Sequence, residues 1–135
     1  GVEGFVFRGD DGLDEITLAT TTQVLSIGNG EIQSGLIDPA DFGISKAPIS
    51  ALVGGDAKEN AEIAMRIFNG EHGAPRDAVV LNASAAIAAY NGDLDYDLKT
   101  RLAAGVDAAR QAIDSGAAKD LLNRWIKLTQ ALVKS

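Results

Sequence analysis

The sequence predicts an α/β protein, with mixed sheet strands in its first third and about four helices packed on them. Three observations support this: an apolar run at 4–7, a threonine-rich stretch ending in a hairpin signal, and apolar residues at helical spacing beyond residue 57. The 135 residues suffice for one domain with a real core and are too few for two. We therefore expect residues 1–135 to form a single domain or a piece of one.

Turn-forming residues divide the first third of the chain into predicted strands. The apolar run at 4–7 is typical of a buried strand, and residues 16–27 are rich in threonine and β-branched side chains. The Gly-Asn-Gly triplet at 28–30 is a strong hairpin signal, which makes residues 31–37 the return strand. Pro39 ends that strand because proline has no N–H for the ladder.

Four helices are expected after an irregular connection over 39–50 that holds one short helical turn. The first spans 57–68, where Asp56 can cap the helix and Glu59 can complete a capping box. The apolar stripes expected to face the core are Ala61, Ala64, Ile67 and Phe68; then Val79, Val80, Ala83, Ala86, Ile87 and Tyr90; then Leu98, Leu102, Val106, Ala109 and Ile113; and finally Leu121, Leu122, Trp125, Leu128, Leu132 and Val133.

Charge and composition exclude several classes of function. The formal net charge of −7 disfavours binding to nucleic acid and to anionic membranes, which both require a basic surface. Cysteine is absent, so the chain has no disulfide framework and no thiolate nucleophile or zinc ligand. No apolar run approaches membrane-spanning length and no signal peptide opens the chain, so a cytoplasmic location is expected.

The acidic stretch at 8–15 is the strongest candidate for a functional site. It follows a predicted strand, and its two glycines permit a tight turn. Adjacent side chains point to opposite faces of a strand, but in a loop Asp14 and Glu15 can share one target. A magnesium ion takes one or two carboxylates and fills its other positions with water and phosphates. The stretch therefore predicts a Mg²⁺ site with Asp14 and Glu15 as ligands; the alternative is a solvated acidic turn.

Other short motifs have structural interpretations, and no catalytic residue is assigned. The Asp-Phe-Gly tripeptide at 41–43 is expected to be a turn, because nothing else of the kinase set is present. The Gly-Gly-Asp segment at 54–56 is expected to be a capped helix entrance rather than a phosphate cradle. His72, the only histidine, is expected to be a solvated loop residue, and Trp125 a core residue.

Five segments together resemble one known family. They are Asp-Gly-Leu-Asp-Glu at 11–15, the stretch 37–43, Gly-Gly-Asp-Ala-Lys-Glu-Asn-Ala at 54–61, Arg-Asp-Ala-Val-Val-Leu-Asn-Ala at 76–83, and Ala-Ile-Asp-Ser-Gly at 112–116. In order and spacing they resemble the C-terminal portion of anthranilate phosphoribosyltransferases, which have a class II nucleoside-phosphorylase-like fold. The resemblance implies that the chain is part of the large α/β domain of that fold.

The resemblance also implies a reaction. The family transfers the 5-phosphoribosyl group of phosphoribosyl pyrophosphate (PRPP) to anthranilate and releases pyrophosphate, in tryptophan biosynthesis. Its acidic pair holds Mg²⁺ against the diphosphate, a role that falls here on Asp14 and Glu15. The family's Gly-Thr-Gly-Gly-Asp loop is absent from this sequence, and Arg8 stands where family members often have histidine. The resemblance thus implies a homodimeric parent enzyme, a missing N-terminal portion, and an isolated chain that is inactive and self-associates.

Two alternatives remain open. One keeps the fold but assigns a pentosyltransferase that uses another acceptor. The other is a non-catalytic interaction domain, which would have no need of Asp14 or Glu15. Metal binding by these two residues separates the last alternative from the enzymes.

Overall fold

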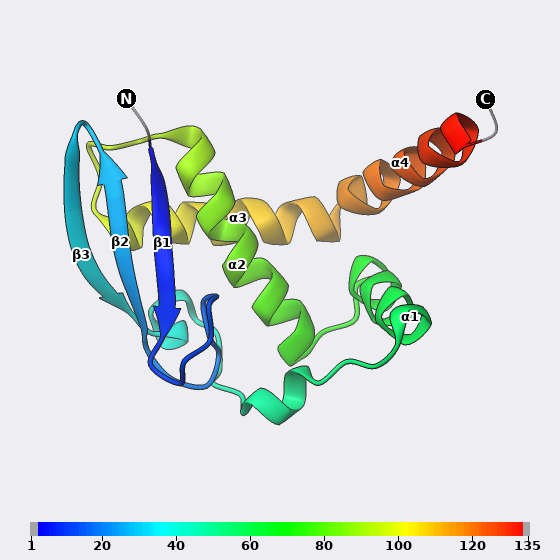
Figure 1. Cartoon of the computed structure of the whole chain (residues 1–135), viewed down its shortest axis with the longest axis horizontal. Coiled ribbons are helices and arrows are strands. Elements are labelled where there is room, and N and C mark those ends of the chain that lie inside the picture. The colour runs from blue at the N-terminus through cyan, green and yellow to red at the C-terminus, as the bar shows by residue number, and fades with distance from the viewer. Residues whose placement is uncertain (1–2, 134–135) are drawn as a thin grey trace.

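A three-stranded antiparallel sheet packs against helices in the computed structural model, which describes residues 3–133 (Figure 1). The strands run in the order β1 (Gly4–Gly9), β2 (Thr22–Gly28) and β3 (Glu31–Ile37). They are followed by the 3₁₀ turns η1 (Pro39–Phe42) and η2 (Ile49–Leu52), and by the helices α1 (Ala57–Phe68), α2 (Ala74–Asn91), α3 (Leu98–Asp114) and α4 (Ala117–Val133). The predicted α/β class, with a hairpin and four helices, is confirmed.

The β2–β3 hairpin forms at the predicted triplet. Gly28 pairs with Glu31, which leaves a two-residue loop of Asn29 and Gly30. Both loop residues have positive φ, 52° and 79°, as a type I′ turn requires. Asparagine and glycine tolerate this region best, so these residues determine the strand register.

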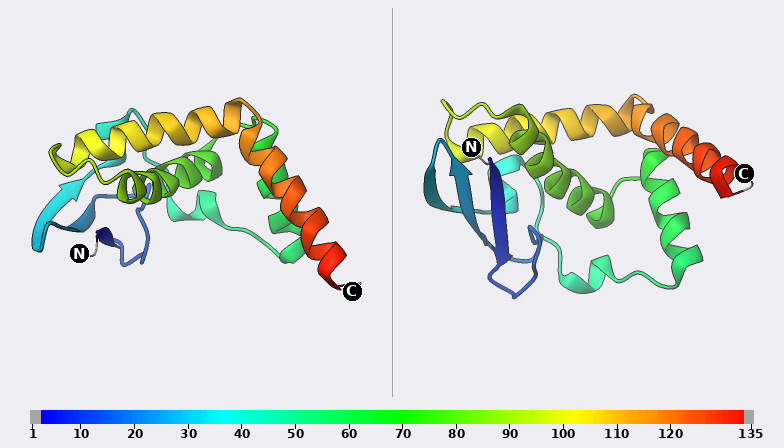
Figure 2. Two further views of the ribbon diagram at one scale, coloured as in Figure 1. Left: turned by 90° about the horizontal axis from the view of Figure 1, so that it is seen from above. Right: turned by 45° about the horizontal axis from the view of Figure 1, so that its top comes forward.

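Strand β1 is covered on one face only. Helices α2 and α3 lie on the same side of the sheet in all three ribbon views (Figures 1 and 2). Phe5 and Phe7 point to that side and are half-buried, whereas Val6 is 53% exposed. The prediction of a strand buried throughout is therefore wrong, because an antiparallel sheet with one open face alternates between core and surface.

Residues 16–21 do not belong to a strand, although their composition predicted one. Ile16, Thr17 and Leu18 are buried in an irregular segment that leads into β2. The backbone of Ile16 is hydrogen-bonded by the side chain of Asn82 instead of a strand partner. This tertiary contact overrides the local β-propensity.

Helices α2 and α3 form the centre of the core. The predicted stripe of α3 is confirmed, since Leu102, Val106, Ala109 and Ile113 are buried and Leu98 packs against them. The predicted stripe of α2 is half right: Val80 is buried, and Ala83 and Ile87 are partly buried against the core. The other three predicted residues are exposed, namely Val79, Ala86 and Tyr90, and Tyr90 is 92% accessible. The unpredicted buried residues of α2 are Leu81, Ser84, Ala85 and Ala88, and Gly105 of α3 approaches the backbone of Ser84.

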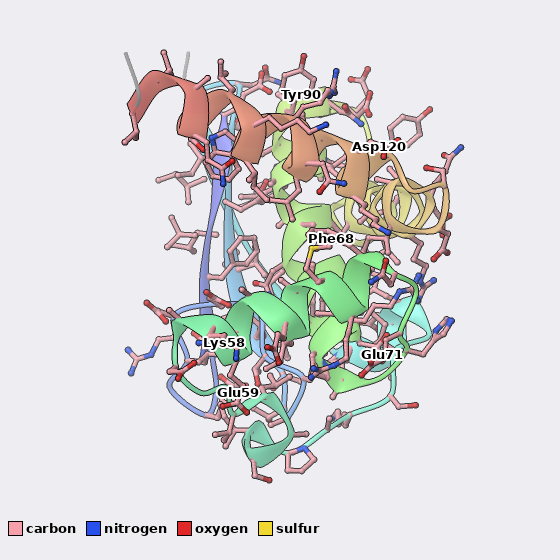
Figure 3. The ribbon with its side chains drawn as sticks, turned by 90° about the vertical axis from the view of Figure 1, so that its right-hand side faces the viewer. Lys58, Glu59, Phe68, Glu71, Tyr90 and Asp120 are labelled. Carbon is pink, nitrogen blue, oxygen red and sulfur yellow. The ribbon has the colours of Figure 1, made fainter. Side chains whose placement is uncertain are left out.

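Helices α1 and α4 lie at the edge of this core. Figure 3 looks onto α1, where Lys58, Glu59 and Phe68 are labelled, and shows α4 above it in this view. Ile67 is buried and Phe68 is half-buried, while the apolar face of α4 is exposed and Trp125 is 64% accessible. The prediction that Trp125 is a core residue is wrong for this chain, because no described segment covers that face. No helix among residues 3–133 is long and apolar enough to cross a membrane.

Candidate functional site

The loop that follows β1 is tightly anchored at both ends. The Gly9 N–H donates to the Leu13 carbonyl at 2.8 Å, and the Asp10 N–H donates to the Thr21 carbonyl at 2.9 Å. Gly9 is buried, and a Cβ at this position would collide with the Asp11 carboxylate and lie 3.1 Å from Thr17 Cγ2. A side chain at Gly9 would therefore displace the Asp11 carboxylate, which accepts the Thr17 hydroxyl.

Two of the four loop carboxylates hold the loop together. Asp10 accepts hydrogen bonds from the Thr21 hydroxyl and from Gln23 Nε2. The Thr21 hydrogen bond, followed by that of Gln23, lowers the pKa of Asp10 below its ordinary value. These bonds hold the start of the loop against the chain that enters β2.

Asp11 plays the corresponding part inside the turn. Its carboxylate accepts the Thr17 hydroxyl at 2.6 Å and the Leu13 N–H at 3.1 Å. The hydrogen bond from Thr17, and then that from Leu13, lowers the pKa of Asp11. Asp10 and Asp11 are thus occupied in local structure.

Asp14 and Glu15 are the two carboxylates that remain. Both are exposed, and neither forms a hydrogen bond or an ion pair with any residue in the part of the chain that the structure describes. They are consecutive residues of the anchored loop, which begins where β1 ends. They are therefore available to an external cation.

Asn82 of α2 fixes the point where this acidic pair rejoins the core. Its Oδ1 accepts the Ile16 N–H at 2.9 Å, and its Nδ2 donates to the Ile16 carbonyl at 3.0 Å. Nδ2 also donates to the Ala78 carbonyl at 3.0 Å, which holds the side chain against its own helix. Asn82 therefore positions the residue directly after Glu15. Sequence reasoning missed this role, although a polar amide among apolar residues of a core helix was a usable signal.

An apolar groove adjoins Glu15. It has a volume of about 340 Å³ and lies between η2, α1 and the start of α2. Its lining comprises Leu52, Val53, Gly54, Asn60, Ile63, Ala64, Ile67, Phe68, Pro75, Ala78, Val79 and Glu15. The carboxylate of Glu15 is the only charged group in this lining, so the acidic pair borders an otherwise weakly polar surface.

The donor set fits part of a magnesium site. Mg²⁺ binds proteins through one or two carboxylates and keeps water and phosphate oxygens as its other ligands. Asp14 and Glu15 provide those carboxylates without competing partners. No group of three or more acidic or histidine side chains that could hold a metal ion occurs between residues 3 and 133. The described residues thus offer carboxylates for an ion shared with a phosphate ligand, and no complete protein cage.

The remaining motifs have the structural roles expected of them. The segment at 41–43 closes η1, where Asp38 and Asp41 form a capping box and Gly43 adopts a left-handed conformation. Asp56 caps α1 by accepting the Glu59 N–H at 2.9 Å, although the reciprocal half of the predicted capping box is not formed. These residues therefore form the ends of η1 and α1.

His72 is exposed, and its Nδ1 lies 3.2 Å from Arg76 Nη1. Arg8, at the end of β1, is exposed as well. No hydrogen bond or ion pair among the described residues joins His72 or Arg8 to Asp14 or Glu15.

Residues 1–119 match the glycosyl transferase family, a/b domain. The match covers most of the chain, and the chain belongs to this family. Within the family it is similar to anthranilate phosphoribosyltransferases. It is 50% identical over 129 residues to that of a Nocardioides species and 48% identical over 135 residues to that of Rhodococcus jostii. These alignments cover 96% and 100% of this chain but only 38% and 37% of the relatives.

Solved structures agree with this placement. The anthranilate phosphoribosyltransferase of Thermus thermophilus superposes with a TM-score of 0.74 at 34% identity, over 93% of this chain and 35% of that one. The enzyme from Saccharomyces cerevisiae in complex with PRPP and Mg gives a TM-score of 0.81 at 23% identity, over 96% of this chain and 36% of that one. The second likeness shows the fold alone. The family resemblance inferred from the five sequence segments is confirmed.

Proposed function

We propose that this chain is the C-terminal portion of an anthranilate phosphoribosyltransferase. The parent enzyme transfers the 5-phosphoribosyl group from PRPP to the amine of anthranilate and releases pyrophosphate. The observation that carries the proposal is the acidic pair Asp14 and Glu15, held free on an anchored loop in a chain that is half identical to such enzymes. Tryptophan biosynthesis, a cytoplasmic location and a homodimeric parent belong to the same proposal.

Asp14 and Glu15 would hold Mg²⁺, which neutralises the negative charge that grows on the departing pyrophosphate. The chain's own contribution is positional. Asp10 and Asp11 shape the loop that carries the two carboxylates, and Asn82 fixes the backbone of Ile16, directly after Glu15. Neither carboxylate needs to move a proton in this role.

Reconstitution tests the whole proposal. The chain is mixed with the remaining N-terminal portion of its parent as a separate polypeptide, and anthranilate consumption with PRPP and Mg²⁺ is measured by chromatography. We expect turnover in the mixture and none with either polypeptide alone. No turnover in a mixture shown to form a folded complex would contradict the proposed acceptor and favour a related pentosyltransferase.

Substitution tests the metal ligands. In the full-length parent, Asp14→Asn with Glu15→Gln should raise the Mg²⁺ concentration for half-maximal PRPP use by more than about tenfold, without lowering the melting temperature. Asp107→Asn with Glu62→Gln removes the same two charges from exposed positions and serves as the matched control. An unchanged Mg²⁺ dependence would contradict the assignment of Asp14 and Glu15 as metal ligands and return them to a solvated acidic turn.

A further inference from the structure

Arg101 of α3 is a buried cation without a charged partner. Its side chain belongs to a residue that is only 6% exposed. Nη1 donates to Ser26 Oγ at a long 3.3 Å, and the guanidinium carbon lies 4.8 Å from the centre of the Phe5 ring. Within residues 3–133, Arg101 forms no ion pair, and its Nε has no hydrogen-bond partner. Burying an unpaired charge is costly, so this arrangement requires an explanation.

Arg76, another buried arginine, is paired with a carboxylate. It is 5% exposed, and its Nη2 lies 2.5 Å from the Asp114 carboxylate. This ion pair ties α2 to α3 and neutralises the guanidinium. Arg101 lacks such a carboxylate although it is buried to the same extent, so its charge is left uncompensated by the described chain.

A small cavity opens beside Arg101. It has a volume of about 120 Å³ and lies between the β2–β3 hairpin and the start of α3. Gln33 is the register partner of Ser26 and therefore lies on the same face of the sheet as the Arg101 contact. The cavity lining includes Arg101, Ser26, Gln33, Glu31, Leu94 and Leu98.

Two glycines allow the β2–β3 hairpin to pack closely against the opposite wall of this cavity. A Cβ at Gly28 would lie 2.7 Å from Leu94 Cδ2, and a Cβ at Gly35 would lie 2.7 Å from Leu98 Cδ2. Glu31 also borders the cavity, but it is exposed and forms no ion pair with Arg101. The walls of the cavity are thus closely packed, while the Arg101 guanidinium at one side of it has no carboxylate partner among the described residues.

We propose that this cavity binds a small oxyanion, the carboxylate or phosphate group of a ligand, with Arg101 as its charge partner. A guanidinium group binds both kinds of oxyanion through charge-assisted hydrogen bonds. The Ser26 hydroxyl and the Gln33 amide add neutral donors on the same face. The site lies at the hairpin end of β2, whereas Asp14 and Glu15 lie beyond the opposite end of β1 (Figure 1).

The test observes Arg101 directly. The full-length parent is labelled with ¹⁵N-arginine, and the Nε–H resonance of Arg101 is identified by its absence in Arg101→Gln. The protein is titrated with sodium acetate in one arm and with inorganic phosphate in the other, with sodium chloride holding the ionic strength constant. We expect a saturable shift of this resonance. If only acetate saturates the shift, the ligand carries a carboxylate. If only phosphate saturates it, the ligand carries a phosphate. Saturation by both salts assigns a general oxyanion site.

Gln33→Glu is the decisive variant because it is isosteric and supplies an internal carboxylate. The Arg101 resonance should be displaced before any anion is added and should then respond to neither salt. Arg124→Gln removes one positive charge from the exposed face of α4 and should leave the titration unchanged. A linear, unsaturable response in the unsubstituted protein, or an unaltered titration in Gln33→Glu, would overturn the proposal. Neither result bears on the Asp14 and Glu15 proposal.

Discussion

Asn82 makes three hydrogen bonds that no other residue type of its size can reproduce. Its amide both donates to and accepts from the Ile16 backbone, and it also bonds its own helix. The Ile16 N–H and carbonyl are partly buried, so loss of the amide leaves them unpaired. The geometry of the acidic loop thus depends on a side chain more than sixty residues away along the chain.

Asn82→Ala in the full-length parent should therefore lower the free energy of unfolding by about 1–3 kcal/mol. It should also weaken Mg²⁺ affinity by about tenfold, as expected for a residue that supports metal ligands. Urea unfolding and Mg²⁺ titration measure the two effects, with Asn123→Ala on α4 as control. An unchanged unfolding midpoint would contradict the role of the amide.

Gly105 allows α3 to touch the backbone of α2. A Cβ at this position would collide with the Ser84 carbonyl group and lie 2.9 Å from Ser84 Cα. Both residues are buried. The helices therefore cross at a contact that a single methyl group would separate.

Gly105→Ala should destabilise the protein by about 1–3 kcal/mol through overpacking, although alanine is the better helix former. Ala104→Gly, at an exposed position of the same helix, measures helix propensity alone and should cost about 1 kcal/mol. Both are measured by chemical denaturation. A more stable Gly105→Ala variant would show that the helices can separate at little cost.

At the scale of elements, the acidic loop gives the fold a pH dependence. Hydrogen bonds lower the pKa of Asp10 and of Asp11 from 3.8, the ordinary value that applies in the unfolded chain. A group with a lowered folded pKa stabilises the protein fully above its unfolded pKa, and this contribution is lost as the pH falls through the folded pKa. The loop should therefore loosen below about pH 3.8.

Asp11→Asn isolates this effect. At neutral pH the variant should be less stable than the unsubstituted protein, because the ionised acceptor of the Thr17 hydroxyl is gone. The difference should shrink as the pH falls below 3.8. Thermal unfolding from about pH 2 to about pH 7 checks it, and Asp107→Asn at an exposed helix position should show no such trend. A difference independent of pH would assign the loss to packing.

The elements with distinct local signals could be predicted from the sequence. The Asn29–Gly30 turn, the third strand and the α3 stripe follow from turn chemistry and periodicity. Only part of the buried face of α2 could be predicted, because an alanine-rich helix has little contrast between its sides and Gly105 of α3 packs directly on the backbone of Ser84. The predicted strand over residues 16–21 was also wrong, because the backbone of Ile16 is hydrogen-bonded by the side chain of Asn82, which is distant in the sequence. Asp14 and Glu15 stood out by charge, and Asn82 did not.

At the scale of the whole molecule, the sheet of the described residues has an uncovered face and two unpaired edges. The exposed side of the sheet carries Val6, Leu25, Ile32 and Leu36. Strands β1 and β3 each pair with β2 and with no other described strand. Exposed apolar faces and free strand edges promote association, which agrees with a chain that spans about 37% of a relative's length.

The isolated chain should therefore self-associate, as analytical ultracentrifugation over a range of concentrations would show. Val6→Lys places a charge on the edge strand and should reduce association without altering the helices. Addition of the parent's N-terminal portion should have the same effect by pairing with the chain. A concentration-independent monomer would contradict this prediction.

Helix α4 gives the chain an optical reporter of its own. Trp125 is the single tryptophan of the sequence and lies on the exposed apolar face of that helix, beside Leu121 and Leu128. An indole ring in water emits at longer wavelengths than one in an apolar environment. When the rest of the parent covers α4, the emission should shift to the blue and become less accessible to iodide quenching. Assembly of the divided enzyme can thus be followed in real time, without a label and before any turnover begins.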